Sequence, residues 1–275
     1  MKFSGITILT DMDGTLLDSN KKISEKNLNM IEYFRQNGGT FTIASGRLYK
    51  KIIMYARMLK LDAPVIASNG AVIYDISSDK VVYEKIMNNK CLKLIDEIHS
   101  RFPDTGVEVA SVDCVEFVYS SDMVIKHIKD EDFTSDFPNG EIIWKKPEEI
   151  SVPVVKIMFC DYPDKIDILA QTLPRAYSEY NFFKSDSIYY EMVEPGTNKG
   201  WAVPKLKEIL GDRAKKIYSV GDNMNDIEML KNSDMGICVK NANEEVKKVS
   251  DFILPYTNDE DAIAHLIKMI EKGMV

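Results

Sequence analysis

Cysteine and histidine are scarce in this sequence. Four cysteines and three histidines occur among 275 residues, and the cysteines stand far apart, with no CxxC pair and no histidine nearby. Such an arrangement supplies neither a disulfide framework nor a zinc site. Because scattered, unpaired cysteines are typical of a reducing compartment, we predict a cytoplasmic location.

Long apolar runs and an excess of positive charge are also absent. No segment approaches the roughly 18 consecutive apolar residues that cross a bilayer, and the apolar stretch 6–10 lacks the cleavage site of a signal peptide. The formal net charge is −8, and the scattered lysine pairs leave no basic stripe for a nucleic-acid backbone. We therefore expect neither a membrane span nor a nucleic-acid partner.

Both ends of the sequence contain short apolar strands that alternate with segments of helical periodicity. One such helix is predicted between the capping residue Ser24 and the pair Gly38-Gly39. The predicted strands are 5–10, 40–43, 64–67, 217–220, 235–239 and 252–254, and the other predicted helices are 48–59, 200–210, 225–232 and 259–272. This alternation is typical of a parallel sheet with helices on its faces. We predict an α/β fold with a Rossmann-like parallel sheet.

The middle of the chain has a different pattern, because its strands come in adjacent pairs. Its predicted helices are 88–101 and 163–173, and its predicted strands are 106–110, 115–119, 154–160, 176–183 and 188–193. These elements resemble a βαββ unit that occurs twice, and no element is predicted in the polar stretch 120–140. We therefore predict a core formed by residues 1–83 and 190–275, with an α+β domain inserted at 84–189.

Two aspartates, Asp11 and Asp13, directly follow the first predicted strand. Ligands of open α/β sheets gather at the carboxyl ends of strands, and the alternation of a strand puts both residues on the same side. Two carboxylates so close repel each other unless a cation or a proton lies between them. A polar strand end that runs into an Asp-Gly turn is an equally good interpretation of this pair alone.

Polar residues also follow other predicted strands. Ser45 lies between a strand and a helix, where its hydroxyl either holds phosphate with nearby backbone N–H groups or caps the helix. Lys199 precedes another helix, a position at which an isolated lysine is usually solvated. The run Gly221–Asp226 places two carboxylates and two amides beyond a strand, a good ligand set for a hard cation. The conjunction of these signals indicates a site for phosphate and metal.

The charges of this residue set call for a divalent cation. Aspartate has a pKa about 3 units below neutral pH, so it is already an anion there and needs no base to act as a nucleophile. Attack on phosphate sets anion against anion, at roughly 4 kcal/mol per pair of charges about 4 Å apart in an effective dielectric of about 20. The set holds four carboxylates, Asp11, Asp13, Asp222 and Asp226, and one lysine, Lys199. We predict that Mg²⁺ offsets the surplus.

These segments resemble the motifs of the haloacid dehalogenase-like (HAD) phosphatases, in their order and spacing. The four matching segments are Asp11-x-Asp13-Gly14-Thr15, Ser45-Gly46-Arg47, Lys199-Gly200 and Gly221-Asp222-x-x-Asn225-Asp226. Three further segments, Ser68-Asn69-Gly70-Ala71, 225–230 and Asn241-Ala242, extend the resemblance to the Cof-type sugar-phosphatase branch. The resemblance covers both ends of the chain and implies that 84–189 is the large α+β cap domain that sets substrate specificity.

The resemblance also implies a role for each motif residue. Asp11 would be the nucleophile that forms an aspartyl-phosphate, and Asp13 would protonate the leaving group and then activate water. Mg²⁺ would be held by Asp11, the main-chain carbonyl of Asp13 and Asp222, while Asp226 would orient a metal-bound water or Lys199. The residues implied for the phosphoryl oxygens are Ser45, Lys199, Asn225 and the backbone N–H groups of Met12 and Gly46.

A Mg²⁺-dependent phosphatase of small phosphorylated metabolites, such as sugar phosphates, is the function that the resemblance implies. Arg47 and Asn69 would lie at the mouth of the site and meet the substrate body. A phosphomutase on the same scaffold, which returns the phosphoryl group to the sugar, remains open from the sequence. A non-catalytic sensor of phosphorylated metabolites is disfavoured, because all the motif residues are present.

Overall fold

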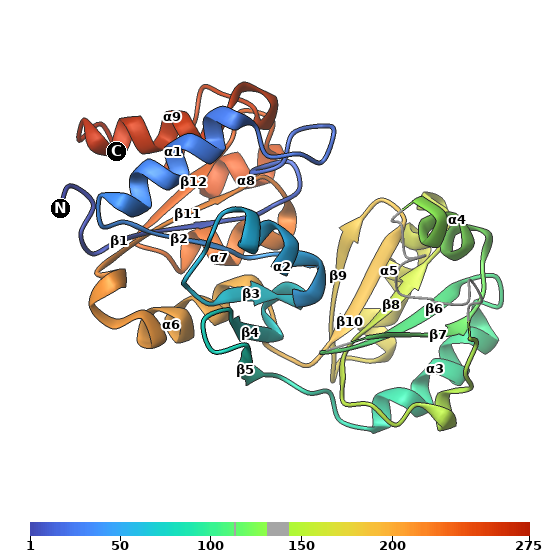
Figure 1. Ribbon diagram of the computed structural model, residues 1–275. Helices are drawn as coiled ribbons and strands as arrows, with labels where there is room; N and C mark the ends of the chain where they lie inside the picture. The colour runs from blue at the N-terminus through green and yellow to red at the C-terminus, as the bar shows by residue number, and fades with distance from the viewer. Residues whose placement is uncertain (113, 131–142) are drawn as a thin grey trace. The chain divides into compact units, whose positions relative to one another are not determined.

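The computed structural model describes residues 1–112, 114–130 and 143–275. The chain folds into two compact units: both ends form one, Met1–Tyr83 with Asn198–Val275, and the segment Glu84–Thr197 forms the other (Figure 1). The second unit extends beyond residue 189 because strand β10 (Tyr189–Val193) pairs within its sheet. Over the described ranges, no helix combines the length and the hydropathy needed to cross a membrane.

A five-stranded sheet forms the centre of the first unit, with the strand order β13-β12-β11-β1-β2 and parallel pairing throughout. Its strands are β1 (Ile6–Thr10), β2 (Thr40–Ile43), β11 (Lys216–Gly221), β12 (Met235–Cys238) and β13 (Phe252–Ile253). Helices cover both faces, so a strand such as β2 is buried at every position. The predicted α/β fold with a parallel sheet is confirmed.

The helices of the first unit lie close to their predicted positions, except α8, which the sequence analysis does not predict. They are α1 (Glu25–Gln36), α2 (Tyr49–Met58), α6 (Lys199–Leu210), α7 (Ile227–Lys231), α8 (Glu244–Val249) and α9 (Ala262–Glu271). Figure 1 shows α1 beside α9 on one face of the sheet and α6 with α7 on the other. As predicted, Ser24 caps α1, and its side chain accepts a hydrogen bond from the backbone N–H of Asn27.

One predicted strand leaves the parallel sheet. Strand β3 (Val65–Ala67) is found where the sequence predicts it, but it pairs antiparallel with β4 (Val72–Asp75). Strand β5 (Lys80–Glu84) completes this three-stranded sheet, and a single bridge between Ala44 and Ile66 links β3 to the end of β2. The chain reverses after β3 through the turn Ser68–Gly70.

The second unit contains a five-stranded sheet with the order β7-β6-β8-β10-β9 and antiparallel pairing. Its other strands are β6 (Gly106–Ser111), β7 (Val115–Tyr119), β8 (Val154–Cys160) and β9 (Asn181–Asp186), and its helices are α3 (Lys90–Arg101), α4 (Asp122–Asp130) and α5 (Pro163–Ala176). The second βαββ unit, β8-α5-β9-β10, is present. The first is incomplete, because β5, the strand before α3, pairs with β4 in another sheet.

The stretch 120–140 is only partly described. Helix α4 occupies 122–130, where the sequence pattern predicts no element, and residues 131–140 lie outside the described residues. Its apolar residues Met123, Val124 and Ile128 pack with Phe117 and Tyr189 on one face of the sheet. The polar residues between them hide this periodicity in a single sequence.

A buried polar cluster lies on the same sheet face, opposite the apolar core under α3 and α5. Lys156 Nζ donates to Glu191 Oε1 at 2.9 Å, and both side chains are almost fully buried. Glu108 is completely buried, and its Oε2 has no hydrogen-bond partner among the described residues. Burial raises the pKa of Glu108 to about 7, although the charge of Lys156 opposes the rise.

We expect Glu108→Gln to stabilise the protein at about pH 8 by up to about 3 kcal/mol. A carboxyl whose pKa rises on folding stabilises below its unfolded value of 4.5 and loses that contribution as the pH rises through about 7. The two proteins should therefore unfold alike at about pH 4.5. In a Trp201→Phe background, fluorescence of Trp144, the remaining tryptophan, reports unfolding of this unit. Equal free energies of unfolding for the wild type and Glu108→Gln at about pH 8 would contradict a destabilising ionisation of buried Glu108.

Candidate active site

Adjacent strand ends bring the predicted residues of three motifs together. In the sheet order, β1 lies between β11 and β2, so their carboxyl ends share one edge. Asp11 directly follows β1, Asp222 directly follows β11, and Ser45 lies two positions beyond β2. Asp11 and Ser45 are buried, and Asp222 is partly exposed. The edge predicted from the strand pattern is thus where these polar side chains lie.

Lys199 lies at the centre of this edge. Its Nζ is 2.6 Å from Asp11 Oδ1 and 2.6 Å from Asp226 Oδ1, and its side chain has no exposed surface. Helix α6 begins at Lys199, where Asn198 caps it by accepting a hydrogen bond from the backbone N–H of Trp201. Burial alone would lower the pKa of Lys199, but the charges of Asp11 and Asp226 outweigh it and raise the pKa. The alternative of a solvated lysine is wrong.

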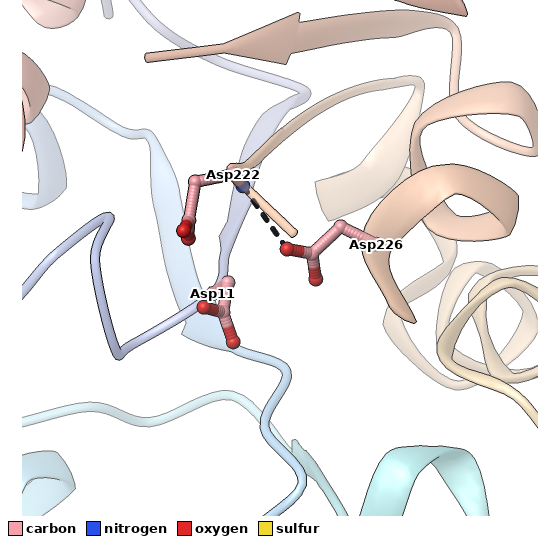
Figure 2. A group of neighbouring side chains, drawn as sticks. All are labelled: Asp11, Asp222 and Asp226. Atoms are coloured by element: carbon pink, nitrogen blue, oxygen red, sulfur yellow. Dashed lines mark hydrogen bonds between the residues drawn. The ribbon is translucent and has the colours of Figure 1, made fainter. Parts of the chain in front are cut away.

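Asp226 is held by donors on both of its oxygens. Oδ1 accepts a hydrogen bond from Lys199 Nζ. Oδ2 accepts hydrogen bonds from the backbone N–H groups of Asp222 at 3.0 Å and Asn223 at 3.1 Å. Figure 2 shows the first of these backbone contacts and the carboxylate of Asp226 turned toward Asp11 and Asp222. Gly221 is needed beside it, because a Cβ there would lie 2.6 Å from atoms of Asp226. Asp226 therefore ties the loop after β11 to Lys199.

Asp11, Asp222 and Asp226 form a group suited to a cation. One carboxylate oxygen from each lies within 4.8 Å of the others, and the side chains converge in Figure 2. Burial raises the pKa of Asp222 to about 7, and the charge of Asp226 adds to the rise, while the hydroxyl of Thr15, 2.7 Å from Asp222 Oδ1, opposes it. Burial also raises the pKa of Asp11, against the charge of Lys199. A cation would relieve this excess of negative charge, so the oxygen ligands fit a divalent metal.

The Asp13 carboxylate lies in an ion pair of its own. Arg47 donates to it through Nε at 2.9 Å and Nη2 at 2.7 Å, and Lys21 Nζ is 2.8 Å from Oδ1. Burial would raise the pKa of Asp13, but the hydrogen bonds and charges of Arg47 and Lys21 outweigh it and lower the pKa to about 2. In this arrangement Asp13 is an anion. Lys21 was not among the predicted site residues, since nothing in its exposed loop sequence distinguishes it.

The loop after β2 and the turn after β3 carry the remaining predicted residues. Ser45 does not cap helix α2, whose N-cap is Leu48, and its Oγ instead accepts the backbone N–H of Arg47 at 3.2 Å. Asn69 Oδ1 accepts a hydrogen bond from Asn225 Nδ2 at 3.0 Å. A side chain at Gly46 would lie about 3.0 Å from the Asn69 amide. The helix-cap alternative for Ser45 is therefore wrong.

Two residues that were not predicted as site residues make hydrogen bonds within the site. Thr15 Oγ1 donates to Asp222, as described above, and Asn241 Nδ2 donates to the backbone carbonyl of Gly14 at 2.8 Å. Gly14 has φ +75° and lies so close to Asp222 that a Cβ would meet its Oδ2 at 2.6 Å. Thr15 and Asn241 belong to segments that resemble the family motifs, but only the fold shows their contacts.

A profile of the haloacid dehalogenase-like hydrolases matches residues 8–267. The chain belongs to this family of hydrolases, which confirms the resemblance predicted from the motifs. Relatives named as phosphatases support a phosphomonoester hydrolase as its enzyme class.

Individual relatives match nearly the whole chain at low identity. YxeH of Bacillus subtilis (strain 168) is 26% identical over 269 residues, which cover 94% of this chain and 96% of that protein. The 5-amino-6-(5-phospho-D-ribitylamino)uracil phosphatase YitU of the same strain is 24% identical over 265 residues, covering 95% and 96%. The crystal structure of a haloacid dehalogenase-like hydrolase from Bacteroides thetaiotaomicron is similar with a TM-score of 0.80 and 27% identity, covering 96% of this chain and 98% of that one.

Proposed function

We propose that this protein is a Mg²⁺-dependent phosphatase of small phosphorylated metabolites that works through an aspartyl-phosphate on Asp11. The observation that carries the proposal is the buried contact of Lys199 with Asp11 and Asp226 beside Asp222. The lysine can bind phosphoryl oxygens. The carboxylates around it can bind a divalent cation.

Asp11 is the proposed nucleophile. Its Oδ1 is held by Lys199, so its carboxylate has a fixed orientation. In the first step a carboxylate oxygen of Asp11 forms a bond to phosphorus and the ester P–O bond breaks, which releases an alkoxide. In the second step water attacks the phosphorus, and the bond to Asp11 breaks to give orthophosphate and the free carboxylate.

Asp13 is the proposed acid and base. It would give a proton to the departing alkoxide and then take one from the attacking water. The anionic form, held by Arg47 and Lys21, is the form that the second step needs. The first step needs the protonated form, so both Arg47 and Lys21 must move away from Asp13 before the leaving group departs. We infer that Arg47 turns toward the anionic substrate when it binds.

The metal and the phosphoryl oxygens would be held by the remaining motif residues. Mg²⁺ would lie against Asp11, the main-chain carbonyl of Asp13 and Asp222, with Asp226 orienting Lys199. When bound, the ion supplies positive charge to the phosphoryl oxygens and to the crowded carboxylates. The residues proposed for the phosphoryl oxygens are Ser45, Lys199, Asn225 and the backbone N–H groups of Met12 and Gly46.

The second unit, Glu84–Thr197, is the proposed cap domain, which selects the leaving group. YitU, by its name, acts on a phosphorylated ribityl compound, and the resemblance to the Cof-type branch points to sugar phosphates. We propose phosphorylated sugars and polyols as the substrate class, and a cytoplasmic location in keeping with four free thiols. Release of orthophosphate from a panel of sugar, polyol, nucleotide and pyridoxal phosphates tests this class. Isomerised sugar phosphate without orthophosphate would instead show a phosphomutase.

We expect metal removal by EDTA to abolish phosphate release and Mg²⁺ to restore it. Asp222→Asn should raise the Mg²⁺ concentration for half-maximal rate by on the order of tenfold or more, because one charged ligand is lost. Asp234→Asn is the matched control, since that carboxylate pairs with the exposed Lys207. Full activity in EDTA would contradict the metal requirement.

A further inference from the structure

The turn Ser68–Asn69–Gly70 has an unusual backbone. All three residues have positive φ, at +48°, +54° and +94°. For residues other than glycine, the left-handed region is sterically unfavourable. Both Ser68 and Asn69 are almost fully buried, so solvent does not explain the conformation. Strain of this kind persists only where surrounding contacts impose it, and such sites cluster around function.

This turn contacts the loops of three motifs at once. The backbone N–H of Asn69 donates to the Ser45 carbonyl at 3.0 Å, and the Asn69 side chain accepts from Asn225. Gly70 lies against the start of α6, where a Cβ would be 2.1 Å from the Asn198 carbonyl oxygen and 3.2 Å from Lys199 N. The turn therefore fixes the spacing between the groups that we propose for the phosphoryl oxygens.

We propose that Asn69 is a positioning residue, which holds Asn225 and the Ser45–Gly46 backbone in place for phosphate rather than meeting the substrate body. This inference rests on the proposed phosphatase function. In this left-handed conformation the Asn69 side chain accepts from Asn225, while its backbone N–H donates to the Ser45 carbonyl. Asparagine is among the residues that adopt this conformation most readily. Fixing Asn225 before phosphate arrives removes the entropy cost of ordering it on binding.

The test is Asn69→Gly, which removes the amide and relaxes the left-handed backbone. We expect unchanged or higher thermal stability, together with an increase on the order of tenfold in the inhibition constant of inorganic phosphate and a similar loss in kcat/KM. A merely structural role would lower stability and leave phosphate affinity alone. Lys60→Gly is the matched control, because Lys60 is exposed with φ +53° and lies outside the motif segments.

A double-variant cycle tests whether Asn69 acts through Asn225. In an Asn225→Ala background, Asn69→Gly should change phosphate inhibition by less than about twofold, because the contact is already lost. Glycine adopts the left-handed region without steric cost, so we expect Asn69→Gly to fold, and its thermal unfolding checks this. The inference would be overturned if Asn69→Gly kept the wild-type affinity for phosphate. It would also be overturned if the changes in the inhibition constant caused by Asn69→Gly and Asn225→Ala were fully additive in the double variant. Absence of phosphatase activity in the wild type would instead contradict the proposed function.

Discussion

Replacing Asp11 by asparagine is expected to reduce phosphate release by about 10⁴-fold or more. An amide is not a nucleophile toward phosphorus at neutral pH. We expect no other carboxylate of the described site to replace it, because Asp226 is bound on both oxygens, Asp13 is paired with Arg47, and Asp222 is the proposed metal ligand. The residual rate is measured as orthophosphate released under saturating Mg²⁺. A matching rise in KM is not expected, since the introduced asparagine retains the size of the original side chain.

This variant should stay folded. Burial raises the pKa of Asp11, so replacing its charge with a neutral isostere removes a cost of ionisation, while Lys199 retains Asp226 as a partner. Thermal unfolding compared with the wild type checks this point, and Asp234→Asn provides a surface control of the same chemistry. A folded Asp11→Asn protein that releases phosphate at the wild-type rate would contradict the proposal that Asp11 is the nucleophile.

Lys199→Met is expected to have the largest effect on stability, a loss on the order of 3–5 kcal/mol at about pH 8. The substitution leaves Asp11 and Asp226 buried without their shared cation. Because buried carboxylates take up protons more readily than exposed ones, the loss should be smaller at about pH 5. Phosphate release should fall on the order of 10³-fold, since the proposed charged contact of Lys199 to the phosphoryl oxygens is lost. Denaturant unfolding at the two pH values measures the stability change.

A second substitution separates lost charge pairing from lost packing. In Lys199→Met, adding Asp226→Asn removes one of the two unpaired charges and should recover part of the stability. Lys207→Met, which breaks the exposed pair with Asp234, should cost no more than about 1 kcal/mol. If Lys199→Met is as stable as the wild type at about pH 8, the buried ion pairs do not hold the site together.

Much of the fold and site could be predicted because local signals agree with the global structure. The cap at Ser24 and the periodicity after it define α1, and parallel strands necessarily bring Asp11 and Asp222 to one edge. The family motifs then suggest what each residue does, and the family membership is confirmed. Roles of individual residues remain predictions that the variants above test.

Other features depend on contacts distant in sequence. The 188-residue separation between Asp11 and Lys199 hides the burial of that lysine, and only the fold shows that Asp226 shares it. The pairing of β3 with β4 depends on the tight turn between them, although the dipeptide Asn69-Gly70 is a signal for it. Lys21 and Arg47, from separate loops, both contact the Asp13 carboxylate. No spacing in the sequence predicts this pairing.

Trapping the covalent intermediate tests the aspartyl-phosphate mechanism directly. Wild-type protein is mixed rapidly with p-nitrophenyl phosphate and Mg²⁺, quenched in acid, and digested for mass spectrometry of the peptide that contains Asp11. We predict one phosphoryl group on Asp11, formed only with Mg²⁺ and absent in Asp11→Asn. Orthophosphate release in a single turnover without a phosphorylated residue, or with the phosphoryl group on another side chain, would contradict a nucleophilic role for Asp11.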